Sequence, residues 1–317
     1  KKFVISAFLS GSAFGLGNTK WTSYSTAKTN LYQIEKDVHR TIYCGCSYND
    51  TKQISSDYSS NQCGLAARSG LSAGGTARFF RIEAEHVVPS AVLCGNTQGW
   101  AGPELPQLCA DKGDNFGRQC AERIEPCSYA ISDVHNLFPS SGGINGDRSD
   151  RPFVDDIPGD PSEYGKCPVE IAFASSGRSA VEVQGCVRGV VARVSSYMYE
   201  AYSSRGLKVD FSQDQLDLFK KWMCQYLPSK YECDRNNLVG TAQGNLNHIT
   251  SSACNAIQRN VQDANCANVT LLGPKNVCTD PWSPGTPEKP VSESSSTTDM
   301  LGWATAAVTL TSSIVLW

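Results

Sequence analysis

Residues 83–89 read EAEHVVP, and residues 133–139 read DVHNLFP. Each stretch sets a histidine beside a residue that offers a metal ion an oxygen atom: Glu85 in the first and Asn136 in the second. The chain has only four histidines in 317 residues, and two of them lie in these stretches. Carboxylate and amide oxygens suit Mg²⁺, and imidazole titrates near neutral pH. The two stretches therefore predict a hydrolytic metal site.

Hydrolysis of a phosphodiester needs a base for the water, a divalent ion at the leaving oxygen, and a cation for the growing charge. In this hypothesis His86 is the base, and Glu85 and Asn136 hold one ion. Adjacent residues of a strand point to opposite faces, so Glu85 and His86 can flank a phosphate. Taken alone, a Glu–His pair is more often an ordinary surface pair. The hypothesis requires the side chains of Glu85 and Asn136 to meet around a common cation.

Local patterns predict the elements that carry these motifs. Apolar and polar residues alternate over 77–86, which is typical of a half-buried strand. Residues 133–139 begin with helix-capping types and predict the first turn of a short helix. Residues 145–149 read NGDRS and predict a tight turn, in which Asn145 and Gly146 adopt positive φ.

Elsewhere the patterns predict helices and one hairpin, so the expected fold class is α+β with short antiparallel strands. A helix is expected where Leu31, Ile34, Val38 and Ile42 recur at helical spacing. The remaining predicted elements are a hairpin of residues 169–173 and 180–185, and helices at 189–206 and 212–228. The first of these helices carries an apolar stripe of Val191, Val194, Met198 and Tyr202, and Ser212 with Gln215 resembles a capping box at the start of the second.

The composition points to an exported chain. Fourteen cysteines, an even number, allow up to seven disulfides, which persist in oxidising compartments. A zinc site is disfavoured, because no two CxxC pairs stand at finger spacing. Asn49 and Asn268 begin Asn-Xaa-Thr glycosylation triplets. The cysteines assigned to disulfides, with their pairing left open, are Cys44, Cys46, Cys63, Cys109, Cys120, Cys167, Cys233 and Cys254.

The two ends of the chain carry further export signals. Residues 1–17 have a basic start, an apolar run and small residues, as in a signal peptide. A globular domain is expected over 22–278, followed by a Pro/Ser-rich linker at 279–300. The apolar tail at 301–317 is either a GPI-attachment signal or a tail anchor. The net charge of −3 does not mark a nucleic-acid binder, although a local basic groove is compatible with it.

The motifs RIEAEHVVPS, FGRQC, DVHNLFPS, INGDRSDRPF and YGKC follow one another in the order typical of the bacterial endonuclease I family. The chain resembles that family from about residue 30 to 255. The resemblance implies a disulfide-rich fold around a ββα-metal, or His-Me finger, core. It also implies a periplasmic or secreted nuclease that cuts DNA and RNA with little sequence preference and leaves 5′-phosphates. We expect a monomer.

The resemblance implies roles for single residues. His86 matches the general base, and Arg118 in FGRQC matches the arginine that neutralises the phosphate. Glu85 and Asn136 match the ligands of a single Mg²⁺, for which Mn²⁺ or Ca²⁺ can substitute. The residues expected to brace the site or to contact substrate are Glu83, His135, Asp147 and Arg148. Candidates for contacts to backbone phosphates are Arg78, Arg81, Arg123 and Arg151.

The chain also departs from the family pattern. Gly143 stands where relatives often have a glutamate, and Ala84 stands where the family form RIEWEH has an aromatic residue. Six cysteines are additional to those of typical relatives: Cys94, Cys127, Cys186, Cys224, Cys266 and Cys278.

Two other functions compete with the nuclease hypothesis. One is a binding module for nucleic acid with weak or lost catalysis, which would bind DNA without cutting it. The other is a disulfide-rich coat protein, which leaves the ordered motifs unexplained. The intact set of Glu85, His86, Arg118 and Asn136 favours the enzyme.

Overall fold

The computed structural model describes residues 16–57, 61–69, 75–95, 119–120, 122–158, 163–173, 179–267, 269 and 276–278. These residues belong to one compact unit that ends at Gly285. Within them, no helix is both long and apolar enough to cross a bilayer. The predictions for Arg118, Cys109, Asn268, most of the signal peptide, the linker and the apolar tail lie outside the described residues.

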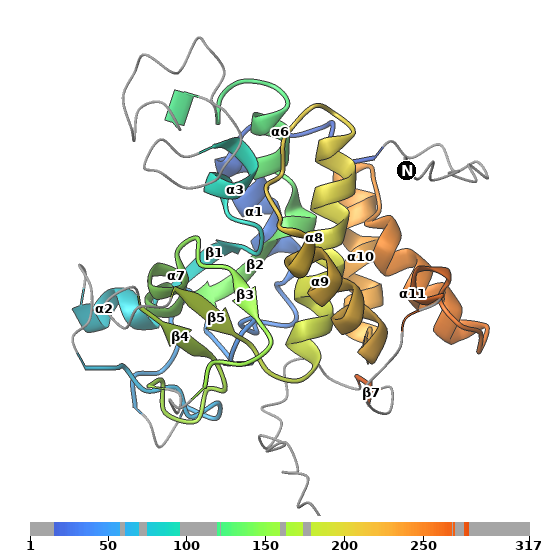
Figure 1. Ribbon diagram of the computed structural model, residues 1–317. Coiled ribbons are helices and arrows are strands. Elements are labelled where there is room, and N and C mark those ends of the chain that lie inside the picture. Colours follow the sequence, from blue (N-terminus) through green and yellow to red (C-terminus); the bar gives the residue numbers. More distant parts are fainter. Residues whose placement is uncertain are drawn as a thin grey trace, which may run out of the picture. The chain divides into compact units, whose positions relative to one another are not determined.

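The fold mixes helices with short strands, which confirms the α+β prediction (Figure 1). The elements follow one another in the order α1 (Tyr24–Ile34), α2 (Gly75–Phe80), β1 (Ile82–His86), α3 (Ser90–Cys94), α6 (Cys127–Ile131), η1 (Val134–Asn136), β2 (Leu137–Ser141), α7 (Gly142–Arg148), β3 (Phe153–Val154), β4 (Glu170–Ala172), β5 (Ala180–Glu182), α8 (Cys186–Ser203), α9 (Gln213–Gln225), β6 (Tyr226–Leu227), α10 (Lys230–Gln243), α11 (His248–Gln258), η3 (Ala264–Cys266) and β7 (Asn276–Val277).

The two histidine motifs lie on one antiparallel pair of strands. β1 pairs with β2 in a register that runs from Ile82 opposite Ser141 to His86 opposite Leu137. Helix α7 starts directly after β2, and the Ser141 hydroxyl caps it by accepting a hydrogen bond from the Ile144 amide at 3.4 Å. The two strands and the helix are in mutual contact, so the end of β1 lies beside the residues of α7.

A second sheet contains the predicted hairpin. β4 and β5 pair antiparallel, with Ile171 opposite Val181, which confirms that prediction. β3 joins the other edge of β5 in a parallel register, so the sheet order is β3-β5-β4. A short parallel pair, β6 with β7, connects the end of α9 to the last described residues.

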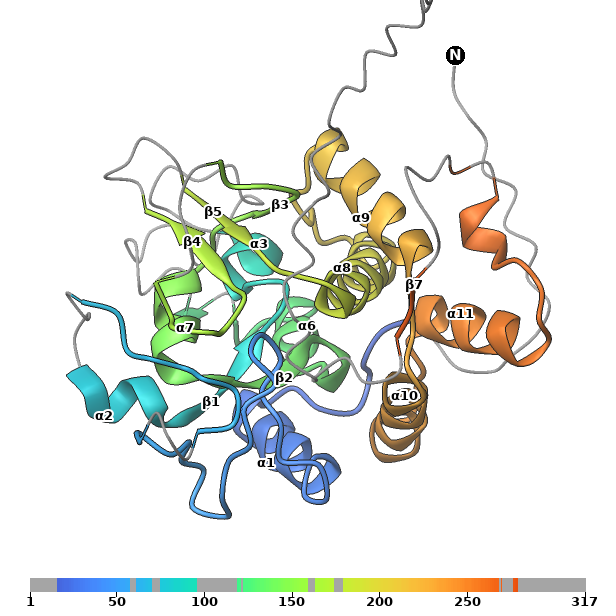
Figure 2. The same ribbon diagram turned by 90° about the horizontal axis from the view of Figure 1, so that it is seen from below.

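The long helices α8 to α11 gather on one side of the β1–β2 pair (Figure 1, Figure 2). The predicted stripe of Val191, Val194, Met198 and Tyr202 is buried along α8, as expected for a helix that packs against the core. The capping box predicted at Ser212 is present at the start of α9.

Six disulfides join described residues. Seven of the eight cysteines assigned to disulfides are bridged, and the eighth, Cys109, lies outside the described residues. The six additional cysteines pair only among themselves. The bridges are Cys44–Cys167, Cys46–Cys63, Cys94–Cys127, Cys186–Cys278, Cys224–Cys266 and Cys233–Cys254.

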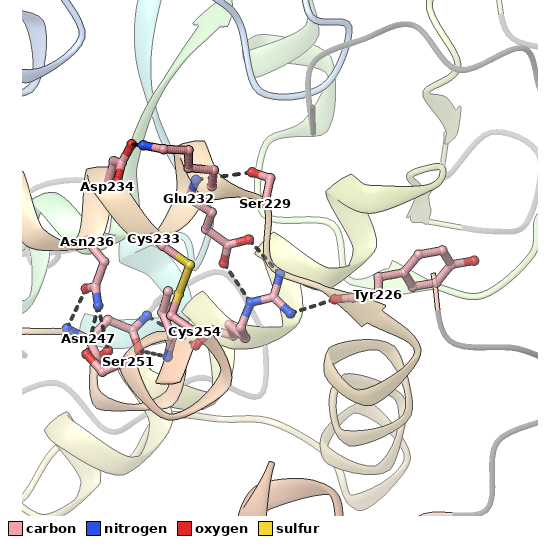
Figure 3. Close-up of a disulfide and its surroundings, with 12 residues drawn as sticks. Tyr226, Ser229, Glu232, Cys233, Asp234, Asn236, Asn247, Ser251 and Cys254 are labelled. Atoms are coloured by element: carbon pink, nitrogen blue, oxygen red, sulfur yellow. Dashed lines mark hydrogen bonds and ion pairs between the residues drawn. A yellow bond between two sulfur atoms is a disulfide. The ribbon is translucent and has the colours of Figure 1, made fainter. Parts of the chain in front are cut away.

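The Cys233–Cys254 bridge joins α10 to α11 next to a buried ion pair (Figure 3). The Arg193 guanidinium donates two hydrogen bonds of 2.6 Å to the carboxylate of Glu232, and a third to the Tyr226 carbonyl at 2.6 Å. Arg193 is fully buried and Glu232 is 7% exposed. A buried charge pair is tolerated when its geometry is bidentate and its remaining donors are satisfied, as here.

Three local predictions are wrong. The helix expected to include Val38 and Ile42 ends at Ile34, because the chain turns there and His39 adopts a φ of +48°. The strand expected from residue 77 begins only at Ile82, because residues up to Phe80 form α2. The first four residues of the NGDRS segment are helical rather than a turn, and positive φ appears only at its last residue, Ser149.

Candidate active site

A cavity of about 350 Å³ opens between the end of β1, the start of α3 and the C-terminal half of α7. Glu85 and His86 line it from β1, and Asn145 and Arg148 line it from α7. The remaining lining residues are Tyr24, Ala84, Pro89, Ser90, Ala91, Glu122, Ile131, Ser149 and Asp150. The fold thus brings residues of the first histidine motif and of the NGDRS segment to one space.

The imidazole of His86 is held in one orientation. Its Nε2 lies 2.8 Å from the Ile131 carbonyl, which only accepts hydrogen bonds, so Nε2 carries the proton and Nδ1 is the basic nitrogen. The ring also stacks on Tyr24, with 5.1 Å between centroids. Burial lowers the pKa of His86 to about 4, against the opposing effect of the Ile131 carbonyl. The imidazole is therefore neutral at pH 7 and ready to accept a proton.

Glu85 is a buried carboxylate with few compensating contacts. It is 1% exposed, accepts a hydrogen bond from the Tyr43 hydroxyl at 2.7 Å, and lies 3.3 Å from Nη1 of Arg148. Burial raises the pKa of Glu85 to about 7, although Arg148 and Tyr43 act in the opposite direction. A further cation in the cavity would stabilise the ionised carboxylate.

Asn145 presents its amide oxygen as a second oxygen donor. Its Nδ2 donates a hydrogen bond of 2.9 Å to Glu83, and among the described residues no hydrogen bond engages Oδ1. Burial raises the pKa of the Glu83 carboxyl, but hydrogen bonds from Arg78 and Arg81 outweigh it, so that pKa is lowered. Glu83 is therefore anionic and orients the Asn145 amide.

The structure places Asn136 outside the cavity. Its Oδ1 accepts a hydrogen bond from the Val88 amide at 2.7 Å, and its Nδ2 donates to the Val88 carbonyl at 2.9 Å. Asn136 is fully buried, so both halves of its amide secure the chain just after His86. In the sequence, its position next to His135 suggested a metal ligand. In the structure, its side-chain amide pairs with the Val88 backbone instead. We therefore do not retain Asn136 as a ligand.

Arg148 connects the cavity to the chain that follows β1. Its Nη1 donates to the His86 carbonyl at 2.8 Å, and its Nη2 donates to the Val87 carbonyl at 2.5 Å. The guanidinium lies 4.7 Å from the centroid of the Phe153 ring. Arg148 is 2% exposed and thus braces the end of β1 from within.

The other expected supporting residues act at a greater distance. Asp147 faces away from the cavity and accepts two hydrogen bonds from Arg68, at 2.6 and 2.7 Å, and one from Tyr164 at 3.0 Å. His135 is 2% exposed, with Nε2 lying 2.9 Å from the Asn245 carbonyl and its ring packed on Tyr197.

The four arginines proposed for phosphate contacts differ in their partners. Arg78 and Arg81 form ion pairs with Glu83, and Arg151 donates to the Asp147 carbonyl. Arg123 is exposed, and no ion pair is found for it among the residues described.

The two departures from the family pattern have structural counterparts. A Cβ added to Gly143 would overlap the ring of Phe79, which fills the space that a side chain would need. Ala84 is buried against α1, and its carbonyl accepts a hydrogen bond from the Tyr24 hydroxyl at 3.1 Å. Tyr24, which sequence reasoning missed, therefore places an aromatic ring beside His86 from another element.

The donor set fits a hard cation that keeps most of its water. No group of three or more His, Cys, Asp or Glu residues suited to a metal occurs in the described part of the chain. Mg²⁺ often takes only one or two protein ligands and retains several waters. The carboxylate of Glu85 and the amide oxygen of Asn145, which line the same cavity, are of the kind that Mg²⁺ prefers.

Comparison with known proteins agrees with the motifs. Residues 10–253 match the family model described as Endonuclease I. The chain is 31% identical over 233 residues to a periplasmic deoxyribonuclease of Aeromonas hydrophila, covering 73% of this chain and 86% of that protein. It is 32% identical over 233 residues to an extracellular deoxyribonuclease of the same organism, covering 73% and 90%. It is 31% identical over 243 residues to Endonuclease-1 of Buchnera aphidicola, covering 73% and 85%. The chain belongs to the endonuclease I family.

Proposed function

We propose that this protein is an exported, Mg²⁺-dependent endonuclease that hydrolyses DNA and RNA with little sequence preference and leaves 5′-phosphate ends. The observation that carries the proposal is the cavity lined by Glu85, His86 and Asn145, in which His86 presents a basic nitrogen. The names of the similar proteins, periplasmic and extracellular deoxyribonucleases, support both the substrate class and the export.

In this mechanism His86 accepts a proton from water at Nδ1. The Ile131 carbonyl keeps Nε2 protonated, so the imidazole stays in the required tautomer during the transfer. The water attacks phosphorus and the bond to the 3′ oxygen breaks. The 3′ oxygen takes up a proton from solvent, and the phosphate stays on the 5′ oxygen. Because a hydrogen bond from Arg148 and the amide of Asn136 fix the chain around His86, the imidazole loses little freedom on reaction.

Glu85 and Asn145 would hold the ion. When bound, a divalent cation neutralises charge on the phosphate and at the leaving oxygen. Glu83 anchors the amide nitrogen of Asn145, which leaves the harder oxygen for the ion. Arg118 keeps its proposed role as the cation that stabilises the phosphate, Mg²⁺ is the proposed ion, and Mn²⁺ or Ca²⁺ are proposed substitutes.

The remaining proposals concern the chain outside the site. We propose that residues 1–17 direct export, that 22–278 form the nuclease domain, and that the 301–317 tail attaches the protein to a membrane after the 279–300 linker. Asn18 is buried and hydrogen-bonded to Asp133 and Tyr202, so we extend the start of the proposed domain from residue 22 back to Asn18. We further propose a monomer with glycans at Asn49 and Asn268; Asn49 is exposed, as an acceptor must be.

Digestion of supercoiled plasmid and of RNA with purified protein tests the proposal. We expect nicking and linearisation of the plasmid, and degradation of the RNA, with Mg²⁺, and none with EDTA. The ends should be substrates for ligation without prior phosphorylation, because the 5′-phosphate is retained. Retention of plasmid in a mobility-shift assay, without cutting in any divalent ion, would instead identify a nucleic-acid-binding homologue that has lost catalysis.

A further inference from the structure

A second cavity, of about 290 Å³, lies on the outer side of α1. Three lysines line it: Lys28 and Lys36 from α1 and its C-terminal extension, and Lys52 from the following loop. All three are exposed, and no ion pair is found for any of them among the described residues. The cavity's one carboxylate, Asp50, lies 3.8 Å from His39. The cavity is therefore a positively charged patch on a chain whose net charge is −3.

Helix α1 links this cavity to the candidate active site. Tyr24 lines the active-site cavity, and Lys28, one helical turn later, lines the second cavity. The ammonium of Lys28 lies 5.7 Å from the centroid of the Tyr24 ring, which also stacks on the imidazole of His86. A nucleic-acid strand that leaves the active site past Tyr24 would next reach Lys28.

Packing against the β1–β2 pair fixes the position of α1. Ala27 and Leu31 are fully buried in a cluster with Ala84 of β1 and Leu137 of β2. Because the helix buries this face, the lysines on its other face stay in solvent. Beside them, the Lys52 ammonium lies 3.9 Å from the centroid of the Tyr32 ring, which places it over the cavity.

We propose that Lys28, Lys36 and Lys52 form a phosphate-binding subsite for the substrate strand, outside the cavity in which the bond is cut. The inference rests on the proposed nuclease function, because it assigns the subsite to the same substrate. Lysine binds phosphate as a point charge and releases counterions from the strand, so the subsite adds affinity without sequence preference. The exposed ammonium groups, for which no carboxylate partner is found in the described part of the chain, are left to pair with phosphate.

The test compares two triple variants that remove the same charge. Lys28→Gln/Lys36→Gln/Lys52→Gln changes the proposed subsite. The matched control, Lys208→Gln/Lys220→Gln/Lys230→Gln, changes exposed lysines near and on α9 and α10.

Binding of a single-stranded oligonucleotide is measured at several salt concentrations, with both triples in a His86→Ala background that prevents cutting. For the subsite triple we expect the slope of log affinity against log salt to become shallower by about 2, since each phosphate contact contributes about 0.7. The control is expected to keep the slope of the His86→Ala parent.

Cleavage assays distinguish an effect on the subsite from an effect on the catalytic cavity. With His86 intact, the subsite triple should raise KM for a long single strand and leave kcat unchanged. A dinucleotide joined by one phosphodiester carries only the phosphate that is cut and has none for the lysines, so its cleavage should be equal in the triple and in the wild type.

Equal salt slopes for the subsite triple and the control would overturn the inference, as would an equal loss on the dinucleotide. A wild type that cuts no nucleic acid would instead refute the proposed function, while the binding slopes would still report on the subsite. The protein should come from a host that adds no N-glycans, because Asn49 stands on the rim of this cavity. A glycan on Asn49 is expected to weaken binding in the same direction as the triple variant.

Discussion

The active-site region and the helical region of α8 to α11 differ in how well their buried charged groups are paired. In the helical region, Arg193 and Glu232 form a bidentate pair, with a further hydrogen bond from Arg193 to a backbone carbonyl. In the active-site region, burial raises the pKa of Glu85 and lowers the pKa of His86, so both groups lack full compensation for lost hydration. The helical region stabilises charges, whereas the site holds poorly compensated groups.

The site keeps its geometry because buried hydrogen bonds between neighbouring elements hold it in place. β1 and α7 have five and seven residues, too short to fix side chains by themselves. Arg148 and Asn136 grip the backbone at Val87 and Val88, and the Ile131 carbonyl holds the His86 ring. Groups with shifted pKa values are therefore the candidates for reacting positions, and the well-paired polar groups beside them are the candidates for structural support.

The largest effect is expected for His86→Ala. Removing a general base costs roughly 10²- to 10⁴-fold in rate, so plasmid cleavage should fall by that factor. Binding of DNA and the melting temperature should change little, because the imidazole is half-buried and makes one hydrogen bond. The control is His248→Ala on α11, which loses an exposed contact to Glu200 and an edge-on ring contact with Tyr197. Undiminished turnover by His86→Ala would exclude this assignment.

Asn145→Ala and Asn136→Ala should separate a reacting position from a supporting one. Asn145→Ala should lower activity by on the order of a hundredfold at fixed Mg²⁺, because metal catalysis contributes several kcal/mol. Asn136→Ala should instead destabilise the fold by about 1–3 kcal/mol, since it leaves the Val88 amide and carbonyl without partners. Urea unfolding and initial rates are measured for both. The reverse pattern would restore Asn136 as the ligand.

Two additional disulfides offer a matched pair, one in each region. Cys94–Cys127 joins α3 to α6, whose last residue, Ile131, holds His86, whereas Cys224–Cys266 joins α9 to η3. Replacing either pair by serine should cost about 2–4 kcal/mol of stability.

Only the change at Cys94 and Cys127 should also lower kcat, measured well below both melting temperatures. Because that bridge closes the path from β1 through α3 and α6 back to His86, its loss loosens the base. Equal kcat values for the two double variants would show that the bridge has no part in positioning His86.

The smallest effect concerns pH and the buried supporting histidine. Burial lowers the pKa of His135 below its ordinary value of about 6.5. The unfolded chain therefore binds a proton that the folded chain does not, and stability falls as pH decreases below about 6.5. The fall from this group is at most about 1.4 kcal/mol per pH unit. His135→Gln should remove that part of the pH dependence in urea unfolding, and an unchanged slope would refute the assignment.

The helical region could be predicted more fully than the site. The stripe on α8 and the capping box at Ser212 are local patterns, so periodicity and end signals were enough to find them. Fourteen cysteines predicted disulfides, but their pairing depends on which segments meet in the fold. That the six additional cysteines pair among themselves became visible only in the structure.

In the site, Glu85 and His86 were found because their motif is local and specific. Asn145 was assigned to a turn, because Asn-Gly favours positive φ, and the Ser141 cap that makes it helical depends on where β2 ends. Asn136 looked like a ligand because nothing in sequence shows that Val88 takes up its amide. Tyr24 lies about 60 positions from His86, and only the packing of α1 against β1 brings the two rings together.

The assignment of Glu85 and Asn145 as metal ligands is tested most directly by locating the cation. Crystals of the His86→Ala protein soaked in Mn²⁺ can be measured at a wavelength at which manganese scatters anomalously. We expect one peak in the cavity, within coordination distance of a Glu85 carboxylate oxygen and of Oδ1 of Asn145. A peak at Asn136, or one that contacts neither Glu85 nor Asn145, would contradict the assignment.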